Sequence, residues 1–365
     1  MIRSLHIRGY KLFEDLTLPA FGRLNLFVGE NNTGKSCLLE AIGLYAGRTP
    51  ATDIIKVAAS RRSDRLNPWD ADNVTEAGTS LLHPVFDLFH CNGGNPSKSI
   101  LIEEVDTHHP LRIDQRLHHV IVDDEGVRRY VPAMAGDIAQ APTEMTLQVF
   151  RGDKQVGLVT RRNIPLRIGT ATEKLNLHDT LVVAHVPASG YSESQAASMW
   201  DALVQGPGQD LVLSWLRIIE PRIQDLAYIG GRLDTRLALV KLEGLSRIPL
   251  RSMGDGLTRL FHIGLAMASA AHGVLLIDEF ENGLHWKAQT KIWDALASAA
   301  NPFDVQIFAT THSRDCIQGF VEVSQAKIFD DSKVYRLERI EGNIVALNLP
   351  LLNVNAAMNQ HSEVR

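Results

Sequence analysis

The chain has 365 residues, of which 45% are hydrophobic and 22% charged, and its formal net charge is −5. This composition is ordinary for a soluble globular protein, and the acidic balance excludes a surface coated for nucleic acid while leaving room for a local basic stripe. The three cysteines lie far apart without CxxC spacing, which excludes a disulfide framework and a zinc site and favours a reducing, cytoplasmic setting.

The first 46 residues are predicted to form strands, a glycine loop and a helix. Alternation of apolar and polar residues predicts a strand over residues 2–7, and residues 16–18 predict a second, short one. The apolar run Leu24–Val28 predicts a buried strand that turns at Gly29, and a helix is expected to begin near Lys35.

The character of the chain changes over residues 51–185, which we interpret as a polar and β-rich insertion. Residues from 51 to about 80 are polar and are expected to be irregular. Short apolar runs bounded by turn residues then predict strands at 100–105, 118–122, 145–150 and 155–159.

Helices and strands alternate in the last third of the chain. Helical spacing is found from about residue 192 to 219, and a strand at 237–242 precedes a small-residue loop at 252–256. A helix to about 271, a strand at 274–277, a helix at 287–299 and a strand at 306–309 follow. The most apolar stretch, 261–277, is thus a helix and a strand, not a membrane span. Such alternation predicts an α/β fold with a mostly parallel sheet covered on both faces.

The strongest motif is a G-x-x-x-x-G-K-[ST] loop that begins at Gly29, immediately after an apolar strand. Its glycines let backbone N–H groups turn inward around phosphate oxygens, and the helix that follows adds a positive dipole end. Lys35 can reach the β- and γ-phosphates, and the Ser36 hydroxyl can ligate Mg²⁺. The residues predicted to hold the nucleotide here are Asn31, Asn32, Thr33, Gly34, Lys35 and Ser36.

Two carboxylates follow the apolar strand at 274–277. Ligands bind beyond the carboxyl ends of sheet strands, so this is the position for a metal-binding carboxylate. Asp278 is predicted to hold Mg²⁺ through water, and Glu279 to orient or deprotonate the attacking water. The alternative, a solvated acidic turn, is disfavoured by the presence of the glycine loop.

Two further sites complete the set of motifs. His312 follows another apolar strand and is placed to hydrogen-bond a γ-phosphate, although a lone histidine is more often structural. Ser252 and Gly254 stand before a helix, where small residues form an anion site, the alternative being an ordinary helix cap.

In this order, the motifs resemble those of the ABC ATPase superfamily. Lys35 and Ser36 match its Walker A motif, Asp278 and Glu279 its Walker B pair, Ser252 and Gly254 its signature loop, and His312 its switch histidine. The resemblance implies ATP and Mg²⁺ as ligands, ATP hydrolysis as the reaction, and a head-to-tail dimer in which the signature loop of one copy contacts the γ-phosphate held by the other.

Several details resemble the RecF, SMC and OLD group more than transporters. Ser252 follows Lys35 by 217 positions (252 minus 35), a longer separation than in transporters, and the signature reads Ser-Met-Gly-Asp-Gly. His285 stands where transporters carry aspartate, and the opening Ile-Arg-Gly-Tyr-Lys-Leu-Phe is similar to that of the group. The resemblance is strongest to stand-alone OLD-like ATPases, many of which serve bacterial antiphage systems. The residues after 311 are too few for the Toprim nuclease domain of OLD nucleases, and Trp286 replaces a proline frequent in the group.

We therefore expect one ABC ATPase domain over 1–350, with its core at 1–50 and 190–350, interrupted by the insertion at 51–185 and followed by a tail at 351–365. The leading hypothesis is a sensor or motor of an antiphage system with a separate effector. A RecF-like DNA repair factor and a nucleotide-locked scaffold with little turnover are the alternatives. Partners are a second copy of the chain and the effector, with no membrane. A nucleic-acid partner stays open because two groups of arginines could line a groove, although solvated loop charges are the favoured interpretation. The groups are Arg61, Arg62, Arg65, and Arg161, Arg162, Arg167.

Overall fold

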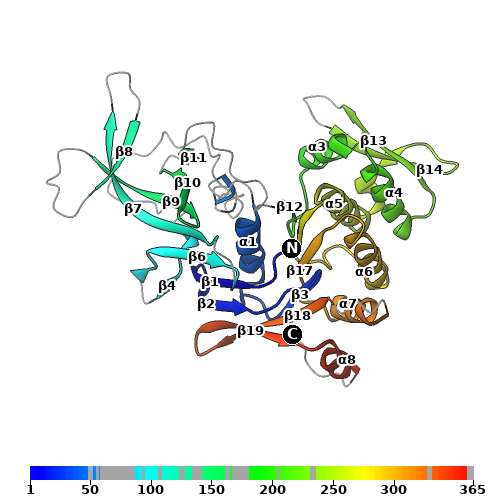
Figure 1. Ribbon diagram of the computed structural model, residues 1–365. Helices are drawn as coiled ribbons and strands as arrows, with labels where there is room; N and C mark the ends of the chain where they lie inside the picture. The colour runs from blue at the N-terminus through cyan, green and yellow to red at the C-terminus, as the bar shows by residue number, and fades with distance from the viewer. Residues whose placement is uncertain are drawn as a thin grey trace. The chain divides into compact units, whose positions relative to one another are not determined.

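The computed structural model describes residues 1–47, 52–54, 57, 87–92, 95–105, 109–122, 128–133, 142–160, 165–166, 181–203, 206–230, 236–326 and 331–359 (Figure 1). The chain forms two compact units. Unit 1 comprises residues 1–3, 20–39 and 181–365, and unit 2 comprises residues 4–19 and 40–180. Among the described helices, none has the length and hydropathy needed to cross a bilayer. Both predicted arginine groups lie outside the described residues.

Unit 1 is built on a six-stranded sheet. The strands lie in the order β12 (Val182–Val186), β16 (Gly273–Ile277), β17 (Gln306–Thr310), β3 (Leu24–Val28), β18 (Ser332–Ile340) and β19 (Asn343–Leu349). The first five strands are parallel, and β19 returns antiparallel to β18. Every residue of β3, β16 and β17 is buried, which is typical of parallel strands covered on both faces. Their carboxyl ends meet at one edge of the sheet, where the predicted site residues follow them.

The helices of unit 1 share one apolar core with this sheet. Side chains of β3, β16 and β17 belong to the same buried cluster as those of α4 (Gly208–Ile219), α5 (Asp255–Ser269), α6 (Trp286–Ala300) and α7 (Arg314–Ala326). Phe280 stacks on Trp293 with ring centroids 4.2 Å apart, which packs the turn after β16 against α6. This packing makes the edge of the sheet a rigid platform for the residues that follow each strand.

The helical lobe that carries the signature loop also lies in unit 1. It contains α3 (Glu193–Leu203), α4 and a three-stranded antiparallel sheet of β13 (Ile223–Gly230), β14 (Arg236–Leu242) and β15 (Ile248–Pro249). A short 3₁₀ turn, η3 (Leu250–Met253), leads from β15 into α5. Residues after 350, expected as a tail, include the helix α8 (Leu351–Asn359).

Unit 2 is an antiparallel sheet. Its eight strands run in the order β11 (Pro165–Leu166), β10 (Lys154–Val159), β9 (Thr143–Arg151), β7 (Leu111–Val122), β6 (Ser99–Glu103), β1 (Leu5–Tyr10) and β2 (Phe13–Leu18), with β8 (Arg128–Pro132) also paired to β7. A two-stranded ribbon of β4 (Cys91–Asn92) and β5 (Asn95–Pro96) accompanies it. The β-rich character expected for the insertion is therefore observed, and only the sheet of unit 1 is mostly parallel.

The first two strands do not pair with the glycine-loop strand. β1 pairs with β2 on one edge and with β6 of the predicted insertion on the other. Strand β1 also begins at Leu5 and ends at Tyr10, three residues beyond each predicted limit. The interruption of one ATPase domain at 51–185 stays a prediction.

Candidate active site

The loop between β3 and α1 (Lys35–Ala46) has the backbone conformation of an anion-binding nest. Gly29, Asn32 and Gly34 have φ values of 143°, 63° and 90°. Such positive values turn successive N–H groups toward the inside of the loop. A Cβ atom at Gly29 would lie 2.5 Å from the Leu337 carbonyl oxygen, so only glycine fits. Asn31 and Asn32 are exposed, whereas Thr33 and Gly34 are buried.

The Lys35 ammonium group is buried inside this loop. Its side chain is 8% exposed, and Nζ donates to the carbonyl oxygens of Gly29 at 2.7 Å and Glu30 at 2.8 Å. Burial lowers the pKa of Lys35, and nearby negative charges oppose that shift. These charges belong to Glu281, Asp278 and Glu279. The loop carbonyls therefore hold the Lys35 ammonium group next to the inward-pointing N–H groups of the nest.

Asp278 joins the glycine loop to two strand ends. Its Oδ1 accepts a hydrogen bond from Ser36 Oγ at 3.0 Å and a second from Thr310 Oγ1 at 2.7 Å. Asp278 follows β16, Thr310 ends β17, and Ser36 lies in the first turn of α1. A hydroxyl and a carboxylate in contact supply the hard oxygen ligands that Mg²⁺ prefers, so these residues fit that ion.

Glu279 occupies a strained backbone conformation. Its φ is 48°, in the left-handed region that non-glycine residues rarely adopt. The Glu279 N–H donates to Thr310 Oγ1 at 2.8 Å, and its Oε2 accepts from Asn282 Nδ2 at 2.7 Å. Asn282 Nδ2 also donates to the Ala188 carbonyl at 3.2 Å. The carboxylate of Glu279 is therefore held in one orientation.

His312 is oriented by Glu281. Glu281 Oε1 accepts from the His312 N–H at 2.9 Å and lies 3.1 Å from His312 Nδ1. Its other oxygen accepts from Thr311 Oγ1 at 2.7 Å. The Glu281 side chain is 10% exposed and that of His312 is 47% exposed. A buried carboxylate thus fixes one face of an imidazole whose remaining edge is open.

Arg259 of α5 fixes the main chain behind these groups. Its side chain is 5% exposed. One guanidinium nitrogen, Nη1, donates to the Pro187 carbonyl at 2.6 Å. The other, Nη2, donates to the carbonyls of Asp278 at 2.5 Å and Glu279 at 3.0 Å. A helix that starts at the signature turn is in this way tied to both acids.

The signature turn is exposed. Ser252 and Gly254 are both accessible, and Gly254 has φ 98° and ψ 160°, a conformation open essentially only to glycine. Within the described residues, no hydrogen bond joins either residue to Lys35, Ser36 or Asp278. A Cβ atom at Gly256 would lie 2.8 Å from the Gly283 carbonyl, so the first turn of α5 packs on the segment after Glu279.

The structure thus brings most predicted residues together and adds four that the sequence reading did not assign. Ser36, Asp278 and Glu279 form one bonded cluster through Thr310, and His312 is attached through Glu281, whereas Ser252 and Gly254 lie outside it. The residues missed are Arg259, Thr310, Glu281 and Asn282. Two signals in the sequence could have identified two of them. Arg259 is a charged residue within the apolar pattern of α5, and Glu281 is a third acid two positions after Glu279.

Comparisons with known proteins agree with this geometry. Residues 1–75 match the family described as "AAA ATPase domain". Residues 164–315 match the family described as "AAA domain, putative AbiEii toxin, Type IV TA system". A Helicobacter pylori protein named ATP/GTP phosphatase is 21% identical over 387 residues, which cover 94% of this chain and 94% of that protein.

The fold is similar to that of SMC heads. The SMC head bound to the C-winged helix domain of ScpA aligns with 12% identity and a TM-score of 0.53, over 96% of this chain and 98% of that one. An SMC head with an extended coiled coil, bound to the C-terminal domain of ScpA derived from Pyrococcus furiosus, aligns with 11% identity and a TM-score of 0.52, over 99% of each chain. At these identities the likeness concerns the fold alone.

The glycine loop, the paired acids and the matched families define a P-loop ATPase of the ABC type. Within that class, the motifs are similar to those of the RecF, SMC and OLD group, and the fold is similar to that of SMC heads.

Proposed function

We propose that two copies of this chain hydrolyse ATP in a head-to-tail dimer, each site combining the glycine loop of one copy with the signature turn of the other. The observation that carries this proposal is the exposure of Ser252 and Gly254, which make no hydrogen bond to Lys35, Ser36 or Asp278 among the described residues of their own chain. Gly254 offers room beside it, since a Cβ there would meet no atom within 4 Å. Small residues before a helix form an anion site, so this turn can contact a phosphate that the other copy holds.

The residues around Asp278 divide the work of binding and catalysis. Lys35 and the loop N–H groups hold the phosphates, and Ser36 and Asp278 hold Mg²⁺, the latter through water. When bound, Mg²⁺ neutralises charge on the phosphate oxygens. Glu279, whose carboxylate is oriented by Asn282, positions and deprotonates the attacking water. His312, oriented by Glu281, donates to the γ-phosphate and so distinguishes ATP from ADP.

Complementation between two inactive variants tests whether the sites are shared. Lys35→Ala removes the loop cation, and Ser252→Arg blocks the exposed signature turn without straining its backbone. Each variant alone is expected to lose ATPase activity. In a mixed dimer, one site combines the intact loop of one copy with the intact turn of the other, so mixing is expected to restore about a quarter of the wild-type turnover.

The matched control replaces Ser252→Arg by a second loop variant. A mixture of Lys35→Ala with Lys35→Glu has no dimer in which one site carries an intact loop, so it should stay inactive. If the first mixture also stays inactive, or if the Ser252→Arg variant alone retains full turnover, the composite site is wrong. Sedimentation with ATP would show in parallel whether mixed dimers form.

We further propose that this ATPase is the sensor or motor of an antiphage system whose effector is a separate protein. The matched AbiEii-type family description and the resemblance to stand-alone OLD-like ATPases support this role. The test compares phage plating on bacteria that carry the gene with its neighbours, in wild-type form and as Glu279→Gln. Protection that depends on Glu279 supports the proposal. Equal plating on both strains, with ATP turnover stimulated by DNA in a salt-dependent manner, would favour a repair factor instead.

A further inference from the structure

One edge of β7 in unit 2 is covered by two different strands with a notch between them. β6 pairs with residues 111–114 of β7, and β8 pairs with residues 118–122. β9 runs along the opposite edge from residue 111 to 119. Residues 115–117 therefore belong to neither ladder on the first edge. Lys98 stands opposite Gln115 and Ala133 opposite Leu117, so among the described residues only Arg116 has no residue opposite it on this edge.

Single hydrogen bonds close the two ends of the notch. The Gln115 N–H donates to the Lys98 carbonyl at 3.0 Å, and the Ala133 N–H donates to the Leu117 carbonyl at 3.0 Å. In an antiparallel strand, the N–H and C=O of one residue point to the same edge. The Gln115 C=O and the Leu117 N–H therefore face the same edge, where Lys98 and Ala133 already stand opposite them, so the notch has no length for an added strand.

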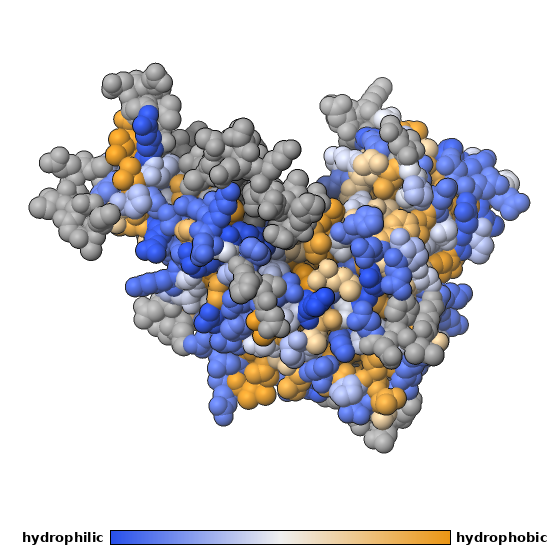
Figure 2. Space-filling view, viewed as in Figure 1, coloured by the Kyte–Doolittle hydropathy of each residue, from blue (hydrophilic) through white to orange (hydrophobic). Residues whose placement is uncertain are grey.

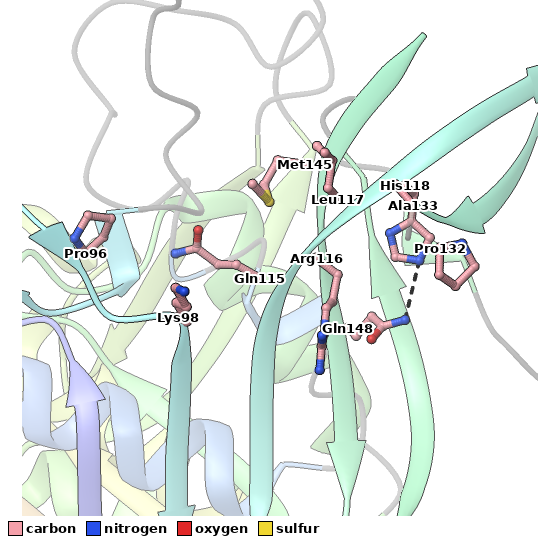
Figure 3. Close-up of a pocket in the computed structure, with 10 residues that line it drawn as sticks. All are labelled: Pro96, Lys98, Gln115, Arg116, Leu117, His118, Pro132, Ala133, Met145 and Gln148. Atoms are coloured by element: carbon pink, nitrogen blue, oxygen red, sulfur yellow. Dashed lines mark hydrogen bonds between the residues drawn. The ribbon is translucent and has the colours of Figure 1, made fainter. Parts of the chain in front are cut away.

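A cleft of about 680 Å³ opens at the notch (Figure 3). Ten residues line it: Pro96, Lys98, Gln115, Arg116, Leu117, His118, Pro132, Ala133, Met145 and Gln148. They come from β5, from the residue that precedes β6, from β7, from β8 and the residue that follows it, and from β9, so the cleft spans the whole notch. A volume of this size holds a few amino-acid residues.

The charge of the cleft has one sign. Lys98 and Arg116 are both exposed, and neither forms an ion pair within the part of the chain that the structure describes. No aspartate or glutamate is among the lining residues. Two cations with no acid among the lining residues favour a ligand that brings a carboxylate or another anion.

The cleft also has an apolar wall. Leu117 and Met145 are cross-strand neighbours on β7 and β9, and they are 45% and 40% exposed. Ile121, 47% exposed, and Val131, 44% exposed, continue the apolar surface along β7 and β8 (Figure 2). Apolar side chains that gather beside cations mark a surface for a partner more often than a solvated face.

The rear of the cleft is preorganised by His118. Its side chain is 2% exposed, and its Nδ1 lies 2.8 Å from Thr146 Oγ1. Its Nε2 lies 3.4 Å from the Gln148 amide nitrogen, which fixes the Gln148 side chain in the wall (Figure 3). A wall held by buried hydrogen bonds loses little conformational entropy when a ligand binds.

We propose that this notch binds the C-terminal end of a partner protein whose last residues are apolar. The terminal carboxylate pairs with Lys98 and Arg116, and the last side chain packs against Leu117 and Met145. The interaction is separate from the nucleotide site and does not depend on the function proposed for it.

The shape of the notch favours a chain end over other ligands. β6 and β8 close both ends, so a long strand cannot continue along β7, whereas the end of a chain can enter the cleft without pairing along the strand. No phenylalanine, tyrosine or tryptophan is among the described residues that line the cleft, and the His118 ring is buried, so the stacking platform typical of single-stranded nucleic acid is missing there. A single terminal carboxylate also matches two cations better than a polyanion would.

The test measures binding of a fluorescein-labelled peptide, Gly-Ser-Gly-Ser-Glu-Val-Leu-Val with a free C-terminus, to the full-length chain by fluorescence anisotropy. Lys98→Glu and Arg116→Glu are each expected to weaken binding about tenfold or more, because each removes a charge-assisted hydrogen bond and adds repulsion. Leu117→Asp should weaken it similarly. Lys291→Glu, an exposed lysine on α6, is the matched charge reversal and should change nothing. ATPase activity should be unchanged in all four variants.

A comparison that needs no variant keeps the proposal falsifiable. The same peptide with a C-terminal amide should bind at least about tenfold more weakly than the free acid, since only the charge differs. Equal binding of the amide, an equal loss in Lys291→Glu, or no saturation up to about 1 mM peptide would overturn the proposal. Octanoate that binds as tightly as the peptide would overturn the assignment to a peptide and leave a small apolar carboxylate as the ligand.

Discussion

The Arg259 guanidinium donates to the main-chain carbonyl of Glu279 at 3.0 Å. Through the same nitrogen it also holds the carbonyl of Asp278 at 2.5 Å. The backbone of the proposed catalytic glutamate has a positive φ of 48°, which costs free energy unless the surroundings enforce it. Arg259 therefore acts as a positioning residue that links the helix of the signature turn to the acids of the active site.

We expect Arg259→Met to destabilise the protein and to lower turnover. The change leaves up to three partly buried carbonyls without their donor, at about 1–3 kcal/mol for each group that stays unsatisfied. Because Arg259 holds the backbone of Glu279 and not the phosphates, kcat should fall by a larger factor than KM rises. Urea unfolding and steady-state phosphate release measure the two effects.

Arg217→Met is the matched control for Arg259→Met. Arg217 also donates to two carbonyls, those of Ile223 and Gln224, but it is exposed. Its loss should cost less than about 1 kcal/mol and leave kcat unchanged, since water replaces the lost donor. If Arg259→Met is stable and active, or lowers stability while kcat stays at the wild-type level, the positioning role is wrong.

Glu279→Gln should abolish turnover while leaving ATP binding intact. The amide has the same shape and can still accept the Asn282 hydrogen bond, but it cannot take a proton from water. The expected loss in kcat is about 100-fold or more. Because hydrolysis reopens the proposed dimer, the variant should also accumulate as a dimer with ATP, which sedimentation would detect. Glu322→Gln, an exposed acid on α7, is the control and should behave as wild type.

Much of the site could be predicted because its chemistry is local in the chain. The glycine loop needs particular residues at fixed spacing. The strand before it has the predicted bounds, Leu24–Val28, because a strand that is buried on both faces has a continuous apolar sequence. The same reasoning placed Asp278 and Glu279 at the end of β16, whose five residues are all buried.

Other parts of the fold depend on contacts that no local pattern encodes. The alternation in β1 predicts a strand but does not say that its neighbours are β2 and β6. Likewise, β18 was not predicted, because apolar and polar residues alternate less regularly in it. It pairs in parallel with β3, which lies more than 300 positions earlier in the chain. Arg259 was missed because an arginine within a helical pattern usually marks a solvated face, whereas here the strand ends supply buried carbonyls.

The contact between Ser36 and Asp278 predicts a shared effect on the requirement for Mg²⁺. The two oxygens are 3.0 Å apart, so each replacement, Ser36→Ala or Asp278→Asn, should raise the Mg²⁺ concentration for half-maximal turnover about tenfold or more. The double variant should be less impaired than the sum of the single effects, since residues that act on one ion are not independent.

A Mg²⁺ titration of ATPase activity in a double-mutant cycle measures this coupling. Ser214→Ala removes a hydroxyl that only donates to the Leu211 carbonyl on exposed α4 surface, and it should leave the titration unchanged. Additive effects of Ser36→Ala and Asp278→Asn would show that the two residues do not share a metal ion.

His262 predicts a loss of stability in mild acid. Burial, with a smaller contribution from the Arg259 charge, lowers its pKa from the ordinary 6.5 to about 4. Its Nδ1 accepts the Tyr191 N–H at 3.2 Å, which requires the neutral ring. Between these two pH values the unfolded chain binds a proton that the folded chain does not. The stabilisation is therefore complete above pH 6.5 and is lost as the pH falls toward 4, by at most about 3 kcal/mol.

Urea unfolding between pH 4.5 and 7.5, followed by the fluorescence of Trp200 and Trp215 in the same apolar cluster, measures this loss. His262→Asn keeps an acceptor for the Tyr191 N–H and cannot be protonated. Its free energy of unfolding should be lower than that of the wild type at pH 7.5. The difference should shrink as the pH falls, because protonation of His262 destabilises only the wild type. Two curves that stay parallel over this range would mean that His262 is protonated in the folded protein as readily as in the unfolded one.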